Sequence, residues 1–427
     1  MTSRSSLWRN RDFMKFWAGD TVSQFGNQIT LLALPLTAVL TLKANALQMG
    51  ILNAASYLPY AAASLFIGVW VDRIRRRPVM IVSALSRALI LVVIVVFARA
   101  HMLRIDYLYG GALVLGAFTV LFDVAYEAYL PSLIDRDALV EGNSRLGVSA
   151  SAAQVSGPAL SGWLARLFTA PMALLADAGS FVVAAAALVA IRKPEPRPAR
   201  TGGERRLRRE MWVGIQFTFG NRVIRACVLE AATYNVFWLV LETVFLLYAT
   251  HDLRMSSSEI GLVLSGGAVG ALAGSMVTGR LSARLGAGGA ISLAMVVGCA
   301  APVLIPLSGG PRPLLFAILT ISYFFGGAGT AVANIQVTSL WQAMAPSDML
   351  GRINASYRFV AIGVVPIGAL LGGVLGDEAG LRPTLFVAAA GIFAASLWIV
   401  FSPIRTMRQV PEIQRAQEPH NAAERTG

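Results

Sequence analysis

Asp137-Ala-Leu-Val-Glu-Gly-Asn143 is repeated in part as Asp348-Met-Leu-Gly-Arg-Ile-Asn354, 211 residues further along the chain. The same ungapped offset also matches Asn, Arg and Gly positions elsewhere. The further pairs are Asn10 and Asn221, Arg11 and Arg222, Gly50 and Gly261, Gly68 and Gly279, Arg73 and Arg284, Gly157 and Gly368, and Gly162 and Gly373. Such a pattern indicates an internal duplication, and two halves related by an axis along the membrane normal are typical of transporters.

The composition is that of a membrane protein. Of 427 residues, 56% are hydrophobic and only 14% are charged, and the mean hydropathy is +0.63. Soluble domains carry about 25% charged residues, and a helix that spans a bilayer needs about 20 apolar residues. The composition therefore excludes an ordinary soluble enzyme.

Two sets of six apolar stretches are separated by a basic segment. Their approximate ranges are 18–42, 46–71, 78–99, 105–128, 144–168 and 171–191, then 222–250, 257–279, 286–309, 313–338, 353–376 and 382–403. Continuous apolarity favours helices, because the strands of a membrane β-barrel alternate. We predict an all-α integral membrane protein of twelve transmembrane helices in two pseudo-symmetric six-helix bundles, residues 1–191 and 221–403. A basic cytoplasmic linker, 192–220, joins them, and a polar cytoplasmic tail, 404–427, follows.

The basic residues fall between apolar stretches. The chain has 36 Lys and Arg against 23 Asp and Glu, a net charge of +13. Nucleic-acid binding would require these charges on one face with interleaved aromatics, so we expect no nucleic-acid partner. Most of them lie in the terminal segments and alternate loops, and such loops face the cytoplasm. We expect a monomer in a lipid bilayer, with both termini cytoplasmic.

Cysteine and histidine offer little chemistry. Cys227 and Cys299 lie inside apolar stretches, and His101, His251 and His420 lie in loops or the tail. We therefore expect no metal site, disulfide framework or cofactor. A proton gradient would have to act through carboxylates.

The second apolar stretch ends in Gly68–Arg77, with the sequence GVWVDRIRRR. An Asp inside an arginine cluster at the membrane edge favours ion pairs that break when two halves separate, although loop arginines alone satisfy the positive-inside rule. This stretch resembles the G-x-x-x-D-R-x-G-R-R signature of the major facilitator superfamily, with Arg75 in place of its second Gly. The candidate gating-loop residues are Gly68, Asp72, Arg73, Arg76 and Arg77.

Two further stretches resemble exporters of that superfamily. Gly157-Pro158-Ala-Leu-Ser161-Gly162 is similar to the G-P-x-x-G-G signature of drug:proton antiporters, with Ser161 in place of one Gly. Gly-Pro permits a helix bend, whereas the alternative is close packing by small residues. Ser23-Gln-Phe-Gly26-Asn27 resembles the opening of the branch with macrolide-efflux and enterobactin exporters, with Asn27 in place of Asp. The resemblance implies the major facilitator fold, export and a place in the bacterial inner membrane.

Charged residues within the apolar stretches are candidates for function, because each costs about 2.5–3.5 kcal/mol at the centre of a membrane helix. Asp123 and Glu127 lie one helical turn apart and can pair with Arg87 or the gating-loop arginines as structural ion pairs; proton carriage is the alternative. The full set is Asp20, Arg87, Asp123, Glu127, Asp177, Glu230, Glu242 and Arg358.

Glu242 is the main candidate for proton coupling or cation recognition. No Arg lies within helical reach of it, and an unpaired membrane carboxylate can take up a proton near neutral pH. Asp20, Asp177 and Arg358 are secondary proton or substrate candidates. Five aromatic residues are candidates for an apolar pocket, with lipid contact or packing as the alternative: Tyr234, Phe237, Trp238, Tyr323 and Phe324.

These features predict a secondary transporter that works by alternating access. We expect proton-coupled export of a hydrophobic or amphipathic small molecule of the antibiotic or siderophore class. The sequence has no G-x-x-x-x-G-K-[ST] motif, which disfavours ATP-driven transport. The alternatives are an importer or a lysophospholipid flippase of the same fold, and an integral membrane enzyme, which the three isolated histidines disfavour.

Overall fold

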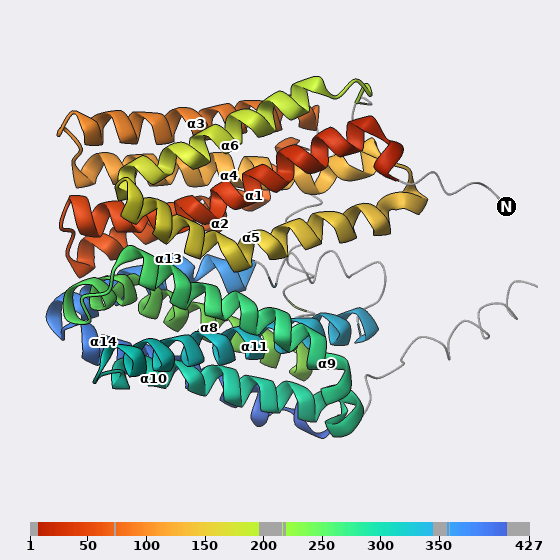
Figure 1. Cartoon of the computed structure of the whole chain (residues 1–427). Helices are drawn as coiled ribbons and strands as arrows, with labels where there is room; N and C mark the ends of the chain where they lie inside the picture. Colours follow the sequence, from red (N-terminus) through yellow and green to blue (C-terminus); the bar gives the residue numbers. More distant parts are fainter. Residues whose placement is uncertain are drawn as a thin grey trace, which may run out of the picture.

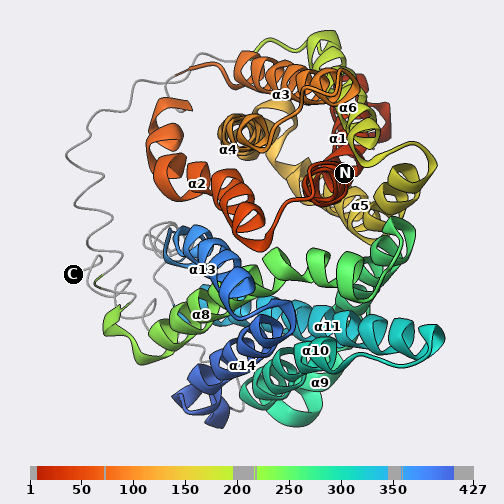
Figure 2. The ribbon, with the colours of Figure 1, turned by 90° about the vertical axis from the view of Figure 1, so that its left-hand side faces the viewer.

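The structure is a computed structural model that describes residues 7–71, 74–195, 216, 219–344, 357 and 359–407. Two bundles of helices lie side by side, the first half above the second in Figures 1 and 2. The first half contains η1 (Leu7–Arg9), α1 (Arg11–Leu36), η2 (Thr37–Thr41), α2 (Ala46–Val71), α3 (Arg76–Arg99), α4 (Ile105–Leu133), η3 (Arg136–Ala138), α5 (Leu139–Leu167) and α6 (Ala170–Ala190).

The second half repeats this layout with one difference. It contains α8 (Arg222–Leu247), η4 (Tyr248–Asp252), α9 (Ser257–Ala300), η5 (Ala301–Val303), α10 (Leu304–Leu307), α11 (Arg312–Met344), α13 (Val365–Glu378), α14 (Leu381–Val400) and η6 (Pro403–Thr406). Gly286, at φ +73°, divides the 44-residue α9 into two arms, which occupy the places of two helices. This left-handed conformation favours glycine.

The duplicated six-helix layout agrees with the sequence prediction. Eight helices of the described residues, with α9 counted once, are long and apolar enough to cross a membrane. The chain is therefore a multi-pass membrane protein, while the count of twelve spans stays a prediction for α1, α2 and α5, which do not belong to those eight. Most of the predicted linker and tail lies outside the described residues.

The repeat is visible in how the two halves begin. Asn10 precedes α1, and its side-chain oxygen accepts hydrogen bonds from the backbone N–H groups of the first turn. Asn221 does the same for α8. A side chain that satisfies these N–H groups stabilises a helix start by about 1 kcal/mol, so the matched asparagines hold equivalent structural positions.

The bundle has two ends, which we name by their residues. The basic face holds the N-terminal segment 7–12 and the connections at 74–75, 134–138, 191–195 and 401–407. The distal face holds the opposite connections, 42–45, 100–104, 168–169, 253–256, 308–311 and 379–380. In Figure 1 the basic face is on the right, where the red helix α1 begins.

The halves meet near the distal face, where α5 packs on α9 and α2 packs on α13. A Cβ atom on Gly162 would meet the backbone of Ser257, and one on Gly50 would lie 2.9 Å from the Cα of Gly373. Backbones in membrane bundles approach this closely only through small residues. The repeat relates Gly50 to Gly261 and Gly162 to Gly373, so these four glycines form two equivalent contacts between the halves.

Hydrogen bonds between the halves lie in the same region. Ala46 N–H donates to Asp377 Oδ1 at 3.0 Å, and Asn53 Nδ2 donates to Thr243 Oγ1 at 3.1 Å. On the other contact, Ala159 N–H donates to Ser265 Oγ at 3.1 Å. Each such bond between membrane helices contributes about 0.6 kcal/mol. The bonds therefore add to the stability of the glycine contacts, but the two halves can still separate.

The Gly157-Pro158 pair also serves packing. α5 runs through Pro158 without interruption, while Gly157 faces the side chain of Gln28 on α1 and the carbonyl of Pro158 faces Gly261. The motif thus brings α5 close to helices on two sides, and its use as a bend stays a prediction.

The glycine contact is testable by adding one methyl group. Gly162→Ala should destabilise the folded protein by about 1–3 kcal/mol, because the backbone of Ser257 must shift. Gly147→Ala on the same helix is the control, since a Cβ there has nothing within 4 Å. Thermal unfolding of the purified variants measures both. Equal losses of stability would contradict the proposed contact.

Candidate functional site

A cavity of about 500 Å³ opens within the first half, between α1, α2, α4 and α6, with one residue contributed by α8. Among the described residues its wall holds carboxylates and no Lys, Arg or His. The carboxylates are Asp20, Asp123, Glu127, Asp177 and Glu242. The structure thus brings together five of the charged residues that the sequence singled out.

Gly26 explains why Asp177 reaches the cavity. A Cβ atom on Gly26 would meet the carboxylate of Asp177 and the hydroxyl of Ser180, so only glycine lets α1 lie against this polar part of α6. Ser180 Oγ donates to Asp177 Oδ1 at 2.9 Å. Asp177 Oδ2 is buried, and the hydroxyl of Thr30 on α1 also acts on this carboxylate.

Arg87 lies behind the cavity wall and is 1% exposed. Its guanidinium carbon lies 4.4 Å from the ring centroid of Phe122 and 4.1 Å from that of Phe181. The charges of Asp123 and Asp177 act on it, and Asp123 also accepts a hydrogen bond from the Tyr60 hydroxyl. The sequence associated Arg87 with Asp123; the role of Asp177 emerges only from the fold.

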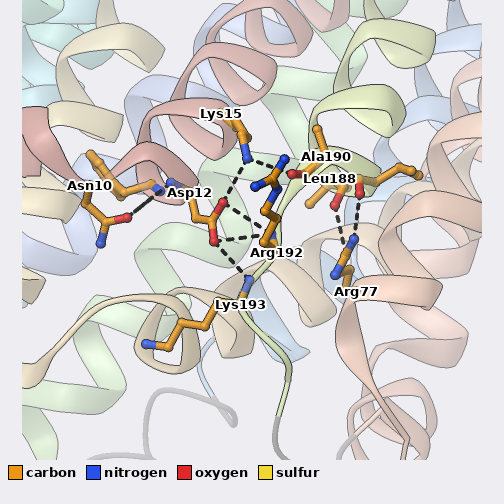
Figure 3. A network of polar contacts seen from close by, with 10 residues as sticks. Asn10, Asp12, Lys15, Arg77, Leu188, Ala190, Arg192 and Lys193 are labelled. Atoms are coloured by element: carbon orange, nitrogen blue, oxygen red, sulfur yellow. Dashed lines mark hydrogen bonds and ion pairs between the residues drawn. The ribbon is translucent and has the colours of Figure 1, made fainter.

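The predicted gating loop is only partly within the described residues. Asp72 and Arg73 lie outside them, and Gly68 lies in the last turns of α2. Arg77 donates from its guanidinium to the carbonyls of Leu188 and Val189, both at 2.8 Å. Arg77 therefore fastens α3 to the end of α6 within the first half (Figure 3).

Two carboxylates that the sequence reading passed over tie the start of the linker to the first half. Asp12 accepts hydrogen bonds from Lys15 Nζ at 2.9 Å and from the N–H groups of Arg192 and Lys193 (Figure 3). Partial burial raises the pKa of Asp12, but these hydrogen bonds outweigh it and hold the pKa below its ordinary value. Glu195 accepts from the N–H groups of Arg76 and Arg77 at the start of α3, at 2.7 and 3.0 Å.

Glu242 lies where the halves meet. Its side chain is exposed and lines the cavity. It accepts a hydrogen bond from the side chain of Trp238, and its charge acts on Tyr57 of α2 and Tyr323 of α11. The next residue, Thr243, accepts the hydrogen bond from Asn53 across the interface.

The predicted pocket aromatics divide into three groups. Tyr234 lines a second, smaller cavity. Trp238 stacks on Tyr234 with ring centroids 5.8 Å apart, and Tyr323 meets Trp238 edge-on. The ring of Phe237 packs against Gly391 of α14, and Phe324 contacts Phe325, so these two serve packing. Arg358 lies outside the described residues.

Comparison with known proteins identifies the family. Residues 2–425 match the model of the family described as transmembrane secretion effector. The chain belongs to this family of the major facilitator superfamily. It is 26% identical over 388 residues to the multidrug efflux pump Tap of Mycolicibacterium fortuitum, covering 88% of this chain and 92% of that protein. It is 27% identical over 307 residues to the enterobactin exporter EntS of Shigella boydii, covering 69% of each.

Solved structures show the same fold. The nucleoside transporter NupG superposes with a TM-score of 0.70 at 13% identity, covering 91% of this chain and 98% of that one. A bacterial homologue of the iron transporter ferroportin gives 0.72 in its inward-facing state and 0.58 in its outward-facing state, both at 16% identity and covering 91% of this chain and 98% of the other. Family and fold are those of transporters, which confirms the resemblance inferred from the motifs.

The buried position of Arg87 in this transporter is testable. Arg87→Met should lower the free energy of unfolding by about 2–4 kcal/mol, because two desolvated cation–π contacts are lost and the carboxylates lose their countercharge. Adding Asp177→Asn should recover part of this loss. Chemical or thermal unfolding in detergent measures the effect.

The matched control is Arg99→Met, at the exposed end of the same helix. Its stability should equal that of the parent protein. If Arg87→Met is as stable as Arg99→Met, the guanidinium does not compensate the cavity acids.

Proposed function

We propose that this transporter exports amphipathic small molecules across the bacterial inner membrane in exchange for protons. The observation that carries the proposal is the cavity wall, which has five carboxylates and, among the described residues, no basic side chain. Such a wall attracts protonated or permanently cationic molecules and repels anions. Within the expected antibiotic and siderophore classes, the charge favours cationic antibiotics over siderophores that carry carboxylate groups.

The names of the relatives support export without fixing a substrate. One is a multidrug efflux pump and another an enterobactin exporter. The proposed partners are the small-molecule substrate and the bilayer, and a single chain suffices because both halves contribute to one cavity. The proton gradient is the energy source, and no bound cofactor is required.

Alternating access accounts for the asymmetry of the contacts between the halves. The halves touch at glycines and share hydrogen bonds near the distal face. We assign the basic face and both termini to the cytoplasm from the positive-inside rule, so the arrangement described here has the cavity closed toward the outside. Export then requires the distal contacts to break while the basic ends approach.

Glu242 is the proposed coupling residue. It belongs to the second half but lines a cavity that the first half otherwise forms. The next residue, Thr243, hydrogen-bonds to Asn53 of the first half. Its neighbours are Tyr57, Trp238 and Tyr323, and none of them is a basic group. A proton and a cationic substrate would therefore compete for this carboxylate, which is the basis of antiport.

Transport into inverted membrane vesicles tests the proposal. Ethidium, a fluorescent organic cation, should accumulate when the vesicle interior is acidified. In Glu242→Gln the pH gradient should no longer accelerate ethidium transport, because an amide cannot exchange a proton. Asp106→Asn, at an exposed distal position, should behave as the parent protein.

The outcomes separate the alternatives. Unchanged pH dependence in Glu242→Gln would remove that residue from coupling. Movement of ethidium only in the opposite direction would identify an importer. Transport of a fluorescent lysophospholipid in place of ethidium would identify a flippase.

A further inference from the structure

A second cavity, of about 230 Å³, lies inside the second half between α8, the second arm of α9 and α11, and it is also lined by Tyr357, Ala361 and Ile362. It shares no lining residue with the larger cavity. Its polar wall includes Glu230, Tyr234, Asn235, Cys299, Thr330 and Tyr357. The volume holds roughly eight water molecules at about 30 Å³ each, which is more than a proton site needs.

Glu230 is the one carboxylate among the described residues that line this cavity. Its side chain is 6% exposed, and in the described part of the chain no hydrogen bond or ion pair satisfies it. The described lining contains no Lys, Arg or His. A buried charge without a partner is costly in a membrane protein, and either a proton or a cation from solution lowers that cost.

The surroundings indicate the kind of cation. The aromatic side chains of Tyr234 and Tyr357 line the same cavity as the carboxylate, and aromatic faces with one acid attract ammonium groups. A metal ion is a poor fit, because among the described residues no three His, Cys, Asp or Glu side chains gather. The remaining donors are neutral groups such as Thr330.

One face of α8 carries lining residues of both cavities. Glu230, Tyr234, Trp238 and Glu242 follow one another at four-residue spacing, which places them along one stripe of the helix. The rings of Tyr234 and Trp238 are stacked, with an interplanar angle of 8°, and Trp238 hydrogen-bonds to Glu242. The stripe is about 18 Å long, with a carboxylate at each end and two aromatic rings between them.

The stripe also has a direction. Glu230 is eight residues from Arg222, the first residue of α8 at the basic face, or about 12 Å along the helix axis. Glu242 is nearer the distal contacts between the halves. A cation that enters from the basic face therefore meets Glu230 before Glu242.

We propose that Glu230, Tyr234 and Tyr357 form a capture site for small organic ammonium cations, from which Tyr234 and Trp238 guide the cation toward Glu242. This rests on the proposed function, since it gives the class of substrate and the order of the sites. It adds a binding site in the second half, separate from the acidic cavity of the first.

Binding of choline to the purified full-length protein tests the site by titration calorimetry. Choline should bind, whereas its uncharged carbon isostere, 3,3-dimethylbutan-1-ol, should not. Glu230→Gln should weaken choline binding about tenfold or more, because a charge-assisted contact is lost. Tyr234→Leu should also weaken it, while Tyr234→Phe, which keeps the aromatic face, should not.

Asp106→Asn is the control, because it removes an exposed carboxylate that lines neither cavity; choline binding at Glu230 should persist in it. Equal choline affinity in Glu230→Gln and the parent protein would overturn the capture site. So would an absence of choline binding, or a Glu230→Gln variant that alters only the pH dependence of export.

The two proposals fail separately. Choline binding that depends on Glu230, together with ethidium transport that does not depend on the pH gradient, would support the capture site and contradict proton-coupled export. Gradient-driven ethidium export, together with choline binding that Glu230→Gln leaves unchanged, would support proton-coupled export and remove the capture site.

Discussion

Two backbone contacts between the halves hold the rest of the structure in place. Gly50 lies against Gly373, and Gly162 lies against the start of α9 near Gly261. The internal repeat pairs Gly50 with Gly261 and Gly162 with Gly373, so the two contacts are equivalent. Helices in a bilayer gain little from the hydrophobic effect, so close packing and a few hydrogen bonds must hold them together. A contact of this kind is strong enough to close one end of a cavity and weak enough to open, which is what a transporter requires.

The cavity carboxylates extend from that closed end toward the basic face. Five carboxylates face the larger cavity, and Arg87 compensates two of them from behind two phenylalanine rings. The remaining negative charge is costly inside a membrane protein, and protons or cationic substrates lower that cost. The same reasoning applies to Glu230 in its own cavity. Under the proposed function, the charge that destabilises the protein by itself is also the charge that recognises the substrate.

The sequence predicted the duplicated helical architecture because apolar length and repeat spacing are local properties of the chain. It also predicted the charged residues of the cavity, since any charge inside an apolar stretch stands out. It did not predict that Asp177 joins Arg87, because that depends on Gly26 letting α1 approach α6. Nor did it predict that Phe237 packs against α14 while Tyr234 lines a cavity. The glycine at position 391 determines which face of α8 packs on α14. The hydrogen bonds of Asp12 and Glu195 need partners far along the chain.

The central claim is that the halves move as two bodies, opening at one face as they close at the other. Distances between spin labels measure this directly, with one pair at Arg99 and Arg312 on the distal face and another at Arg75 and Arg284 on the basic face, after both native cysteines are replaced by serine. On addition of ethidium and a change of pH, the distal distance should lengthen while the basic distance shortens. Two distances that stay constant, or that change in the same direction, would contradict the account.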